Sequence, residues 1–144
     1  MSLAAAVLHL CLLANPGDQQ TCAPATLRPV VTAITREAAR YELDPYVLAA
    51  VIGRESGYHP EATSLLGAVG LMQVLPSTTT TRGFEGHDLY AVGLNVRLGA
   101  RHLRYWYDFC GDLHGALTVY SGRRYCRAST YSKAVLAAVA AVRP

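Results

Sequence analysis

One predicted helix is bounded at both ends by residues that begin and end helices, and it constrains the fold more than any other feature. Asp44 can accept a hydrogen bond as an N-cap, and Pro45 suits the first helical position. Gly57 is a natural helix terminator because glycine readily adopts a left-handed conformation. The intervening sequence reads PYVLAAVIGRES. It predicts a largely apolar helix over about residues 45–56.

Glu55 occupies an unusual place on this helix. Counting back by three, four and seven residues reaches Ile52, Val51 and Leu48, so the carboxyl group shares the apolar stripe. It also lies in the last turn, where the helix dipole disfavours negative charge, and burial and dipole both raise a carboxyl pKa. A carboxyl group that stays protonated near neutral pH is suited to general acid catalysis. The alternative is a structural glutamate paired with Arg54.

The remaining periodicity predicts a mainly α, single-domain protein. The chain has 144 residues, of which 51% are hydrophobic, which suffices for one core. Arg97, Arg101 and Arg104 share a stripe that we expect to be a solvated face. A basic loop, SGRRYCRAS, separates the last two helices. Besides 45–56, helices are expected at about 29–41, 95–109, 113–120 and 130–142, with a short one at 71–75 between irregular and extended segments.

Residues 4–14, AAAVLHLCLLA, are apolar but too short to span a bilayer, so we expect no membrane-spanning segment. They resemble the core of a signal peptide, although the usual basic residues before it are missing. We therefore expect residues 1–28 to be a leader or N-terminal segment, a remnant of a signal peptide, and 29–144 to be the main domain. This predicts export to the periplasm or elsewhere in the cell envelope.

The four cysteines favour disulfides over a metal site, since they form no CxxC pair and lack histidines at zinc-finger spacing. We favour a Cys110 to Cys126 bond, which closes a loop of roughly 15 residues and contributes about 3 kcal/mol. Buried free thiols are the alternative. HExxH is absent and the histidines show no ligand spacing, so we expect neither metal nor cofactor. The net charge of +3 comes without an aromatic-interleaved basic tract, so nucleic acid is not expected as a partner.

The residues from Glu55 onward carry a longer motif, ESGYHPEATSLLGAVGLMQVLPST. It resembles the signature of soluble lytic transglycosylase catalytic domains, which are relatives of goose-type lysozyme. A second stretch, from Asn95 to Leu103, resembles a helix of the same family, and the likeness covers about residues 29–140. In the first stretch the matching positions are Glu55, Ser56, Pro60, Ala62, Ser64, Gly67, Ala68, Gly70, Leu71, Met72, Gln73, Pro76 and Thr78.

The chain departs from the family pattern at three places. His59 stands where the family has asparagine, which we expect to change a turn and not the chemistry. Ser121 replaces another asparagine, in a loop that is one residue shorter and lines the family's cleft, while Tyr120 before it is kept. An acidic residue before the last helix is absent, with residues 127–130 in its place, although Tyr131 matches the family's tyrosine.

The resemblance implies a lysozyme-like fold, α+β in the family's terms, with about six or seven helices around a substrate cleft. It makes Glu55 the single catalytic acid and base, and it places Ser64, Met72, Gln73 and Tyr120 along the cleft, with Tyr120 hydrogen-bonding to or shaping the Glu55 site. Without the motif, Met72 would be assigned to the core and Ser64 to a turn. The implied substrate is peptidoglycan, cleaved between N-acetylmuramic acid and N-acetylglucosamine to give 1,6-anhydromuramoyl products.

Two alternatives remain. The first is a goose-type hydrolase of the same bond, in which Glu85 or Asp88 would activate water. The second is a non-catalytic, glycan-binding accessory domain, which the intact Glu55 disfavours. We expect a monomer, and the resemblance leaves open a secretion or envelope complex as a partner.

Overall fold

The computed structural model describes residues 1–76 and 79–144, so the motif position Thr78 lies outside the described residues. The described chain is mainly helical, as predicted. In order, its elements are α1 (Leu3–Ala14), α2 (Pro24–Tyr41), α3 (Pro45–Ser56), the 3₁₀ helix η1 (Thr79–Thr81), α4 (Val92–Cys110), α5 (Leu113–Tyr120) and α6 (Thr130–Val142).

Three helices have the predicted bounds because their ends are set by local capping. In α3 the Asp44 side chain accepts from the Tyr46 amide, and Gly57 ends the helix with φ of 59°. The ends of α5 and α6 also agree. By contrast, α2 begins at Pro24 and continues through Pro29, so the domain boundary predicted at residue 29 falls inside a helix. The prediction began at Pro29 because proline usually interrupts a helix interior.

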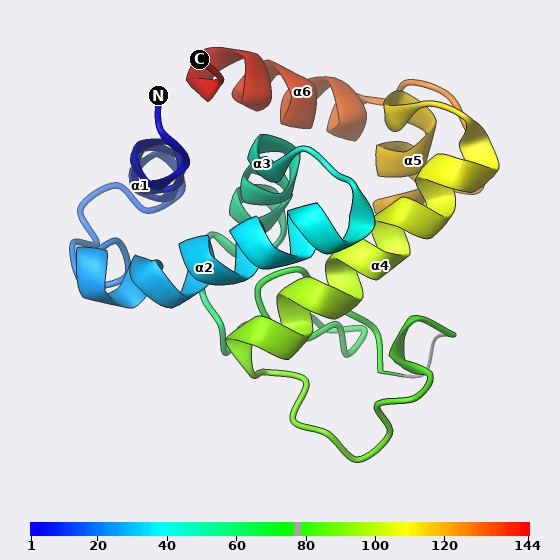
Figure 1. Ribbon diagram of the computed structural model, residues 1–144, viewed down its shortest axis with the longest axis horizontal. Coiled ribbons are helices and arrows are strands. Elements are labelled where there is room, and N and C mark those ends of the chain that lie inside the picture. The colour runs from blue at the N-terminus through cyan, green and yellow to red at the C-terminus, as the bar shows by residue number, and fades with distance from the viewer. Residues whose placement is uncertain (77–78) are drawn as a thin grey trace.

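The helix α3 lies at the centre of the molecule (Figure 1). It contacts α1, α2 and α6, while α4 packs against α2 and α5. Residues 47–52 of α3 are all at most 4% exposed. The helix that carries Glu55 is therefore enclosed by other helices along most of its length, and this enclosure fixes the direction in which its last turn points.

The helix α1 is part of this core. Its Ala6, Val7 and Cys11 are fully buried, and a disulfide joins Cys11 to Cys22. Asn15, just after α1, donates from Nδ2 to the Gly57 carbonyl at 2.7 Å, at the end of α3. Residues expected to form a separate leader therefore pack on α3. Within residues 1–76 and 79–144, no helix has both the length and the apolar character needed to cross a membrane.

The predicted Cys110–Cys126 disulfide is confirmed, with a Cα separation of 5.3 Å. Together with Cys11–Cys22 it uses all four cysteines, so the alternative of free thiols is wrong. The first bond joins α1 to the segment before α2, and the second joins the end of α4 to the loop that follows α5.

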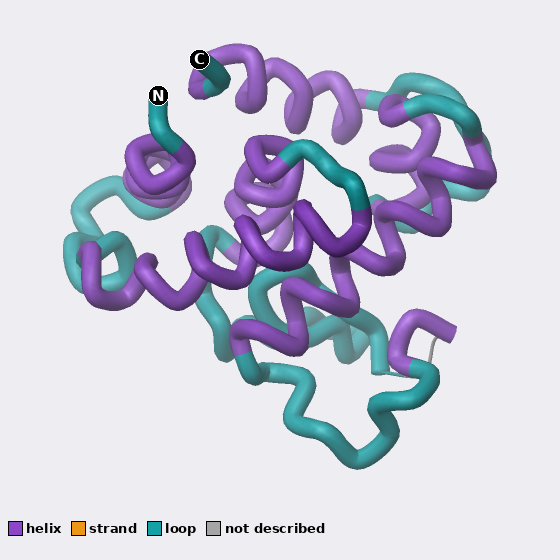
Figure 2. The backbone as a smooth tube through the Cα atoms, viewed as in Figure 1, coloured by secondary structure: helices purple, strands orange, loops and turns teal. Residues whose placement is uncertain are grey.

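The described residues of the segment 57–91 contain no α-helix and lie in the lower part of Figure 2. Isolated bridges pair Val69 with Thr63 and with Val74. The short helix predicted at 71–75 is wrong, because Gly70 and Gln73 have φ of 77° and 51° and the chain turns there. The apolar residues Leu71 and Met72 are nevertheless fully buried, which explains why their pattern resembled a helix.

A buried side chain of α4 holds this turn. The Asn95 Oδ1 accepts from the Met72 amide at 2.8 Å, and its Nδ2 donates to the Val69 and Leu89 carbonyls at 2.9 and 2.8 Å. The approach is so close that a Cβ atom on Gly70 would lie 2.3 Å from Asn95 Nδ2. The irregular segment is thus fixed to α4 by polar contacts within the core.

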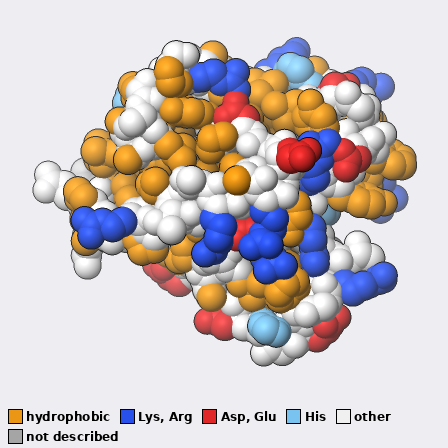
Figure 3. All heavy atoms as spheres, viewed as in Figure 1, with side chains coloured by type: hydrophobic (Ala, Val, Ile, Leu, Met, Phe, Trp, Pro, Cys, Tyr) orange, Lys and Arg blue, Asp and Glu red, His pale blue; other side chains and the backbone are white. Residues whose placement is uncertain are grey.

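Two of the three α4 arginines predicted to form a solvated face contact the irregular segment instead, whereas Arg104 pairs with Asp108 at the surface. Arg97 and Arg101 are half-buried and stack over the Phe84 ring at 5.1 and 5.4 Å, and Arg101 also donates to the carbonyls of Thr80 and Arg82. On α2, the buried Glu37 pairs with Arg36 and Arg40. Figure 3 shows basic side chains gathered around the crossing of α2 and α4. Of these, Arg97 and Arg101 hold residues 80–84 of the irregular segment against α4.

Candidate active site

Glu55 lies in the last turn of α3, half-buried, below the fully buried Leu48, Val51 and Ile52. Burial raises the pKa of its carboxyl group above the ordinary value, and this outweighs the opposing effects of a hydrogen bond from Tyr131 and the charge of Arg54. Glu55 therefore lies on the apolar stripe in the last turn of its helix, as the sequence predicted. A carboxyl group in this environment holds its proton to higher pH than an exposed glutamate does.

Tyr131 is the direct partner of Glu55. Its hydroxyl donates to Glu55 Oε1 at 2.5 Å, and it stands in the first turn of α6. That turn is held by a capping box, in which Ser129 and Ser132 exchange side-chain to backbone hydrogen bonds. Sequence reasoning assigned Tyr131 no role at the site, although its match to the family's tyrosine was a signal that could have identified it.

Tyr120 is the last residue of α5, and its side chain contacts the turn at 70–73. Its hydroxyl donates to the Met72 carbonyl at 2.6 Å, so the direct hydrogen bond to Glu55 comes from Tyr131 instead. Burial, and to a smaller extent the charge of Glu55, raise the pKa of Tyr120 well above its usual range. Tyr120 therefore lies within electrostatic reach of the carboxyl group and ties α5 to the turn at 70–73.

Two of the other predicted residues lie in this turn. Met72 is fully buried, and its side chain packs against Gly99, where an added Cβ would lie 2.4 Å from the sulfur. Its main-chain carbonyl accepts the hydrogen bond from Tyr120. Gln73 is half-buried and donates from Nε2 to the Ala62 and Gly70 carbonyls at 3.2 and 3.1 Å. Gln73 and Tyr120 line a small cavity of about 60 Å³ together with Val74, Leu75, Thr80 and His102.

Ser64 lies apart from that cavity, on an exposed turn. Its hydroxyl accepts from the Ala68 amide at 3.0 Å, and its own amide donates to the Ala68 carbonyl. The structure thus brings Gln73 and Tyr120 together at one cavity, and the Met72 main chain contacts Tyr120. Ser64 lies outside this cavity, in the turn that precedes residues 70–73.

Glu85 and Asp88, the acids named for a water-activating role, are both exposed and occupied in turns. The Glu85 carboxylate accepts from the Gly83 amide, and such backbone hydrogen bonds lower its pKa. Asp88 Oδ1 accepts from the Tyr90 amide at 3.0 Å. Neither carboxylate shares the buried setting that distinguishes Glu55.

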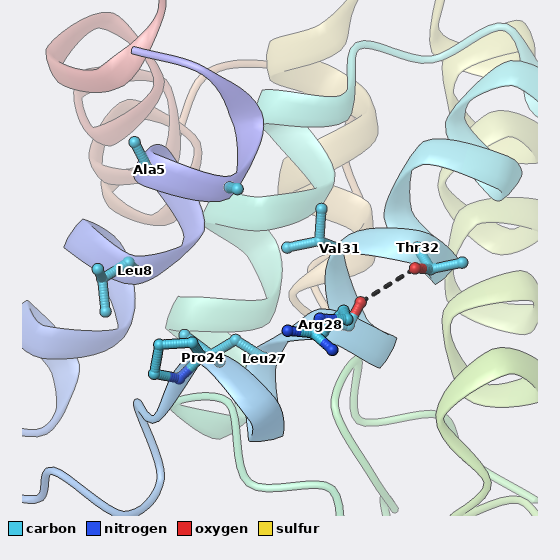
Figure 4. Close-up of a pocket in the computed structure, with 8 residues that line it drawn as sticks. Ala5, Leu8, Pro24, Leu27, Arg28, Val31 and Thr32 are labelled. Carbon is cyan, nitrogen blue, oxygen red and sulfur yellow. Dashed lines mark hydrogen bonds between the residues drawn. The ribbon is translucent and has the colours of Figure 1, made fainter.

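A larger hollow of about 360 Å³ lies between α1 and α2, where Leu8, Pro24 and Val31 face one another (Figure 4). Among the described residues that line it there is no carboxyl group and no predicted site residue, and Arg28 has the one charged side chain. This hollow therefore offers apolar surface without acid or base chemistry.

The arrangement at Glu55 defines a class of site: one carboxyl group with a raised pKa, one tyrosine bonded to it, and a second tyrosine close by, in a small helical domain. Within the described residues no group of three or more histidine, cysteine or acidic side chains could hold a metal ion. Such a site can donate a proton and take one back.

Comparison with known proteins identifies the family. The family model described as "Transglycosylase SLT domain" matches residues 32–136, and the chain belongs to this family. The chain is 40% identical over 85 residues to the transglycosylase of Enterobacteria phage PRD1, covering 59% of this chain and 31% of that protein. It is 28% identical over 114 residues to membrane-bound lytic murein transglycosylase C of Actinobacillus pleuropneumoniae serotype 5b, covering 73% of this chain and 30% of the relative.

A third relative is membrane-bound lytic murein transglycosylase C of Haemophilus influenzae strain PittGG, which is 33% identical over 91 residues, 63% of this chain and 23% of the relative. The matched region spans at most about a third of the length of these relatives. The family likeness therefore concerns the domain that holds Glu55, and not the whole of the longer proteins.

Proposed function

We propose that this protein is a lytic transglycosylase that cleaves peptidoglycan between N-acetylmuramic acid and N-acetylglucosamine. The observation that carries the proposal is the half-buried carboxyl group of Glu55, with its raised pKa and its 2.5 Å hydrogen bond from Tyr131. Family membership and the names of the relatives support the same activity.

The proposed reaction uses one carboxyl group twice. Protonated Glu55 donates its proton to the glycosidic oxygen as the bond from that oxygen to C1 of the muramoyl unit breaks. The resulting carboxylate then accepts the proton of the muramoyl C6 hydroxyl, whose oxygen bonds to C1 and forms the 1,6-anhydro ring. Neither water nor a second carboxylate is consumed, unlike ordinary glycoside hydrolysis.

The tyrosines suit the two stages of this cycle. Burial favours the protonated carboxyl group before bond cleavage, whereas the hydrogen bond from Tyr131 favours the carboxylate that follows it. Tyr120 holds the Met72 carbonyl, and with it the turn at 70–73, beside the carboxyl group. We propose that Gln73 and Tyr120 contact the glycan directly, with Ser64 and the Met72 main chain at the edge of the binding surface.

We also propose that the protein acts in the cell envelope, as the names of its membrane-bound relatives suggest. The two disulfides agree with this location, because disulfides form and persist in oxidising compartments. A monomer suffices for the chemistry, and an envelope or secretion complex stays a prediction. Cleavage of residues 4–14 as a signal peptide also stays a prediction. Packing argues against it, because removal of those residues would take Val7 and Leu10 out of the core. Mass spectrometry of the exported protein's N-terminus tests it.

The activity is tested by mass spectrometry of the fragments released from purified peptidoglycan by the wild type and by Glu55→Gln. We expect anhydromuramoyl ends from the wild type alone. Reducing ends would contradict the proposal in favour of a hydrolase and direct attention to Glu85 and Asp88. Binding of the wild type to peptidoglycan without release of any fragment would favour the accessory-domain alternative.

A further inference from the structure

A second hollow, of about 470 Å³, runs from the edge of the site along α4. Its floor is formed by His102, Trp106 and Phe109, which follow one another at helical spacing and so share one face of α4. Its wall is Arg123, Arg124 and Tyr125, from the loop between α5 and α6. We call this hollow the basic groove. Seven residues of helix span about 10 Å, so the floor extends about that far from His102.

The wall of the basic groove is held firmly. The disulfide between Cys110 and Cys126 joins the loop to the end of α4. On α5, Gly115 lets the loop approach closely, since a Cβ there would lie 2.9 Å from Cys110 Cβ and 3.1 Å from the Cys126 main chain. The arginines therefore project from a braced segment, so ordering them around a ligand costs less conformational entropy.

The arginines of the basic groove have no acidic partner among the described residues, since no ion pair involves Arg123 or Arg124. The nearest acidic residues in the sequence are otherwise engaged, because Asp108 pairs with Arg104 and Asp112 accepts from the Gly115 amide. Both arginines are exposed, and Arg127 beside them stacks over the Tyr125 ring at 4.4 Å. An apolar aromatic floor beneath two free guanidinium groups suits a ligand that has carbon chains and carboxylates.

The basic groove is continuous with the site. His102 lines both the groove and the small cavity that contains Gln73 and Tyr120. Its ring contacts the Trp106 ring on one side and the Tyr120 ring on the other, at centroid distances of 6.2 and 5.4 Å. A ligand in the groove therefore lies next to the place where the glycan would be bound.

We propose that the basic groove binds the peptides that branch from the glycan strands of peptidoglycan, with Arg123 and Arg124 pairing with their carboxylates. This rests on the proposed function, because it takes the glycan at Glu55 as its reference point. The chain then recognises both parts of its polymer: the sugar at the carboxyl group and the acidic peptide on the shortened, disulfide-braced loop.

Binding can be tested without any bond cleavage, because Trp106 is the sole tryptophan of the chain and lies in the floor of the basic groove. Peptides released from peptidoglycan by an amidase are titrated into the protein while tryptophan fluorescence is recorded. We expect a saturable change, with affinity reduced about tenfold in the double variant Arg123→Gln, Arg124→Gln. Arg28→Gln, a loss of charge at an exposed arginine of α2 outside the basic groove, should retain the wild-type affinity.

The same peptides with amidated carboxylates should bind as weakly as acidic peptides bind to the double variant. Equal affinity of wild type and double variant for the acidic peptides would overturn the proposal, as would the absence of a saturable signal. These readouts do not depend on turnover, so they separate this proposal from the proposed activity.

Cleavage assays extend the test to the polymer. The double variant should digest intact peptidoglycan about tenfold more slowly than the wild type but digest glycan strands stripped of peptide at the wild-type rate. An equal loss on both substrates would mean that the arginines act on the glycan or on the fold, and would contradict the peptide assignment.

Discussion

The helical part of the molecule and the segment 57–91 position their side chains by different forces. Glu55 is placed by apolar packing, because α3 is enclosed by α1, α2 and α6 and its stripe of aliphatic residues can face only inward. The turn at 70–73 is placed by single polar contacts, chiefly those of Asn95 and Tyr120. Apolar packing is shared among many side chains, whereas each hydrogen bond that holds the turn comes from a single side chain. The two regions should therefore respond differently to substitution.

The largest expected effect is in the helical part. Glu55→Gln removes the transferable proton while preserving the shape of the side chain, so cleavage should fall by about 100- to 10,000-fold. Thermal unfolding and circular dichroism should show an intact fold, since apolar packing positions this turn. Cleavage within tenfold of the wild type would show that Glu55 is not the proton donor.

In the irregular segment, Asn95→Ala should lower the free energy of unfolding by about 3 kcal/mol, because it leaves the buried Met72 amide without a partner and removes the hydrogen bonds to the Val69 and Leu89 carbonyls. Denaturant unfolding gives this value. Thr32→Ala, at an exposed position where the hydroxyl bonds only within its own helix, serves as the control and should change little. A similar small change in both variants would mean that the turn is held by something other than Asn95.

The disulfide near the N-terminus tests whether α1 belongs to the helical part. Replacing Cys11 and Cys22 by serine should lower the free energy of unfolding by about 2 to 3 kcal/mol, since the bond closes a short loop. The rate of cleavage at low temperature should change little. If α1 were removed before the protein folds, the double variant would unfold like the wild type, so denaturant curves of the exported proteins decide the matter.

Tyr131→Phe tests the hydrogen bond that the tyrosine donates to the Glu55 carboxyl group. Loss of its hydrogen bond should reduce kcat/KM by about tenfold, because the carboxylate formed after proton donation is less stabilised. That bond lowers the pKa of Glu55, so its loss should move the alkaline limb of the pH profile upward. Tyr105→Phe, at a residue 60% exposed on α4, should change neither quantity. An alkaline limb that stays in place would refute this role for Tyr131.

The smallest effect concerns stability against pH. The folded-state pKa of Glu55 is raised above 4.5, so its contribution to stability is full below that pH and is lost as pH rises through the folded value. Glutamine does not titrate. The melting temperature of the wild type should therefore fall relative to that of Glu55→Gln between about pH 4 and pH 8. A constant difference across that range would mean that the carboxyl group ionises normally.

Much of the helical part could be predicted because its determinants are local. The bounds of α3, α5 and α6 follow from caps and from apolar spacing within a few residues. The segment at 71–75 was predicted wrongly because its apolar residues are buried for a reason outside the segment, namely the hydrogen bonds that Asn95 makes from α4. Local periodicity cannot distinguish these two causes of an apolar run.

The site divides in the same way. The amino-acid sequence alone determined that Glu55 lies on an apolar stripe at the end of a helix, because residues three, four and seven positions apart share a helix face. Only the tertiary structure decided that Tyr131 bonds to it, since these residues are 76 positions apart and meet through the packing of α6 on α3. It likewise decided that α1 joins the core and that the loop with Arg123 and Arg124 lies beside Trp106. Such contacts depend on how whole elements pack, and no short stretch of sequence encodes them.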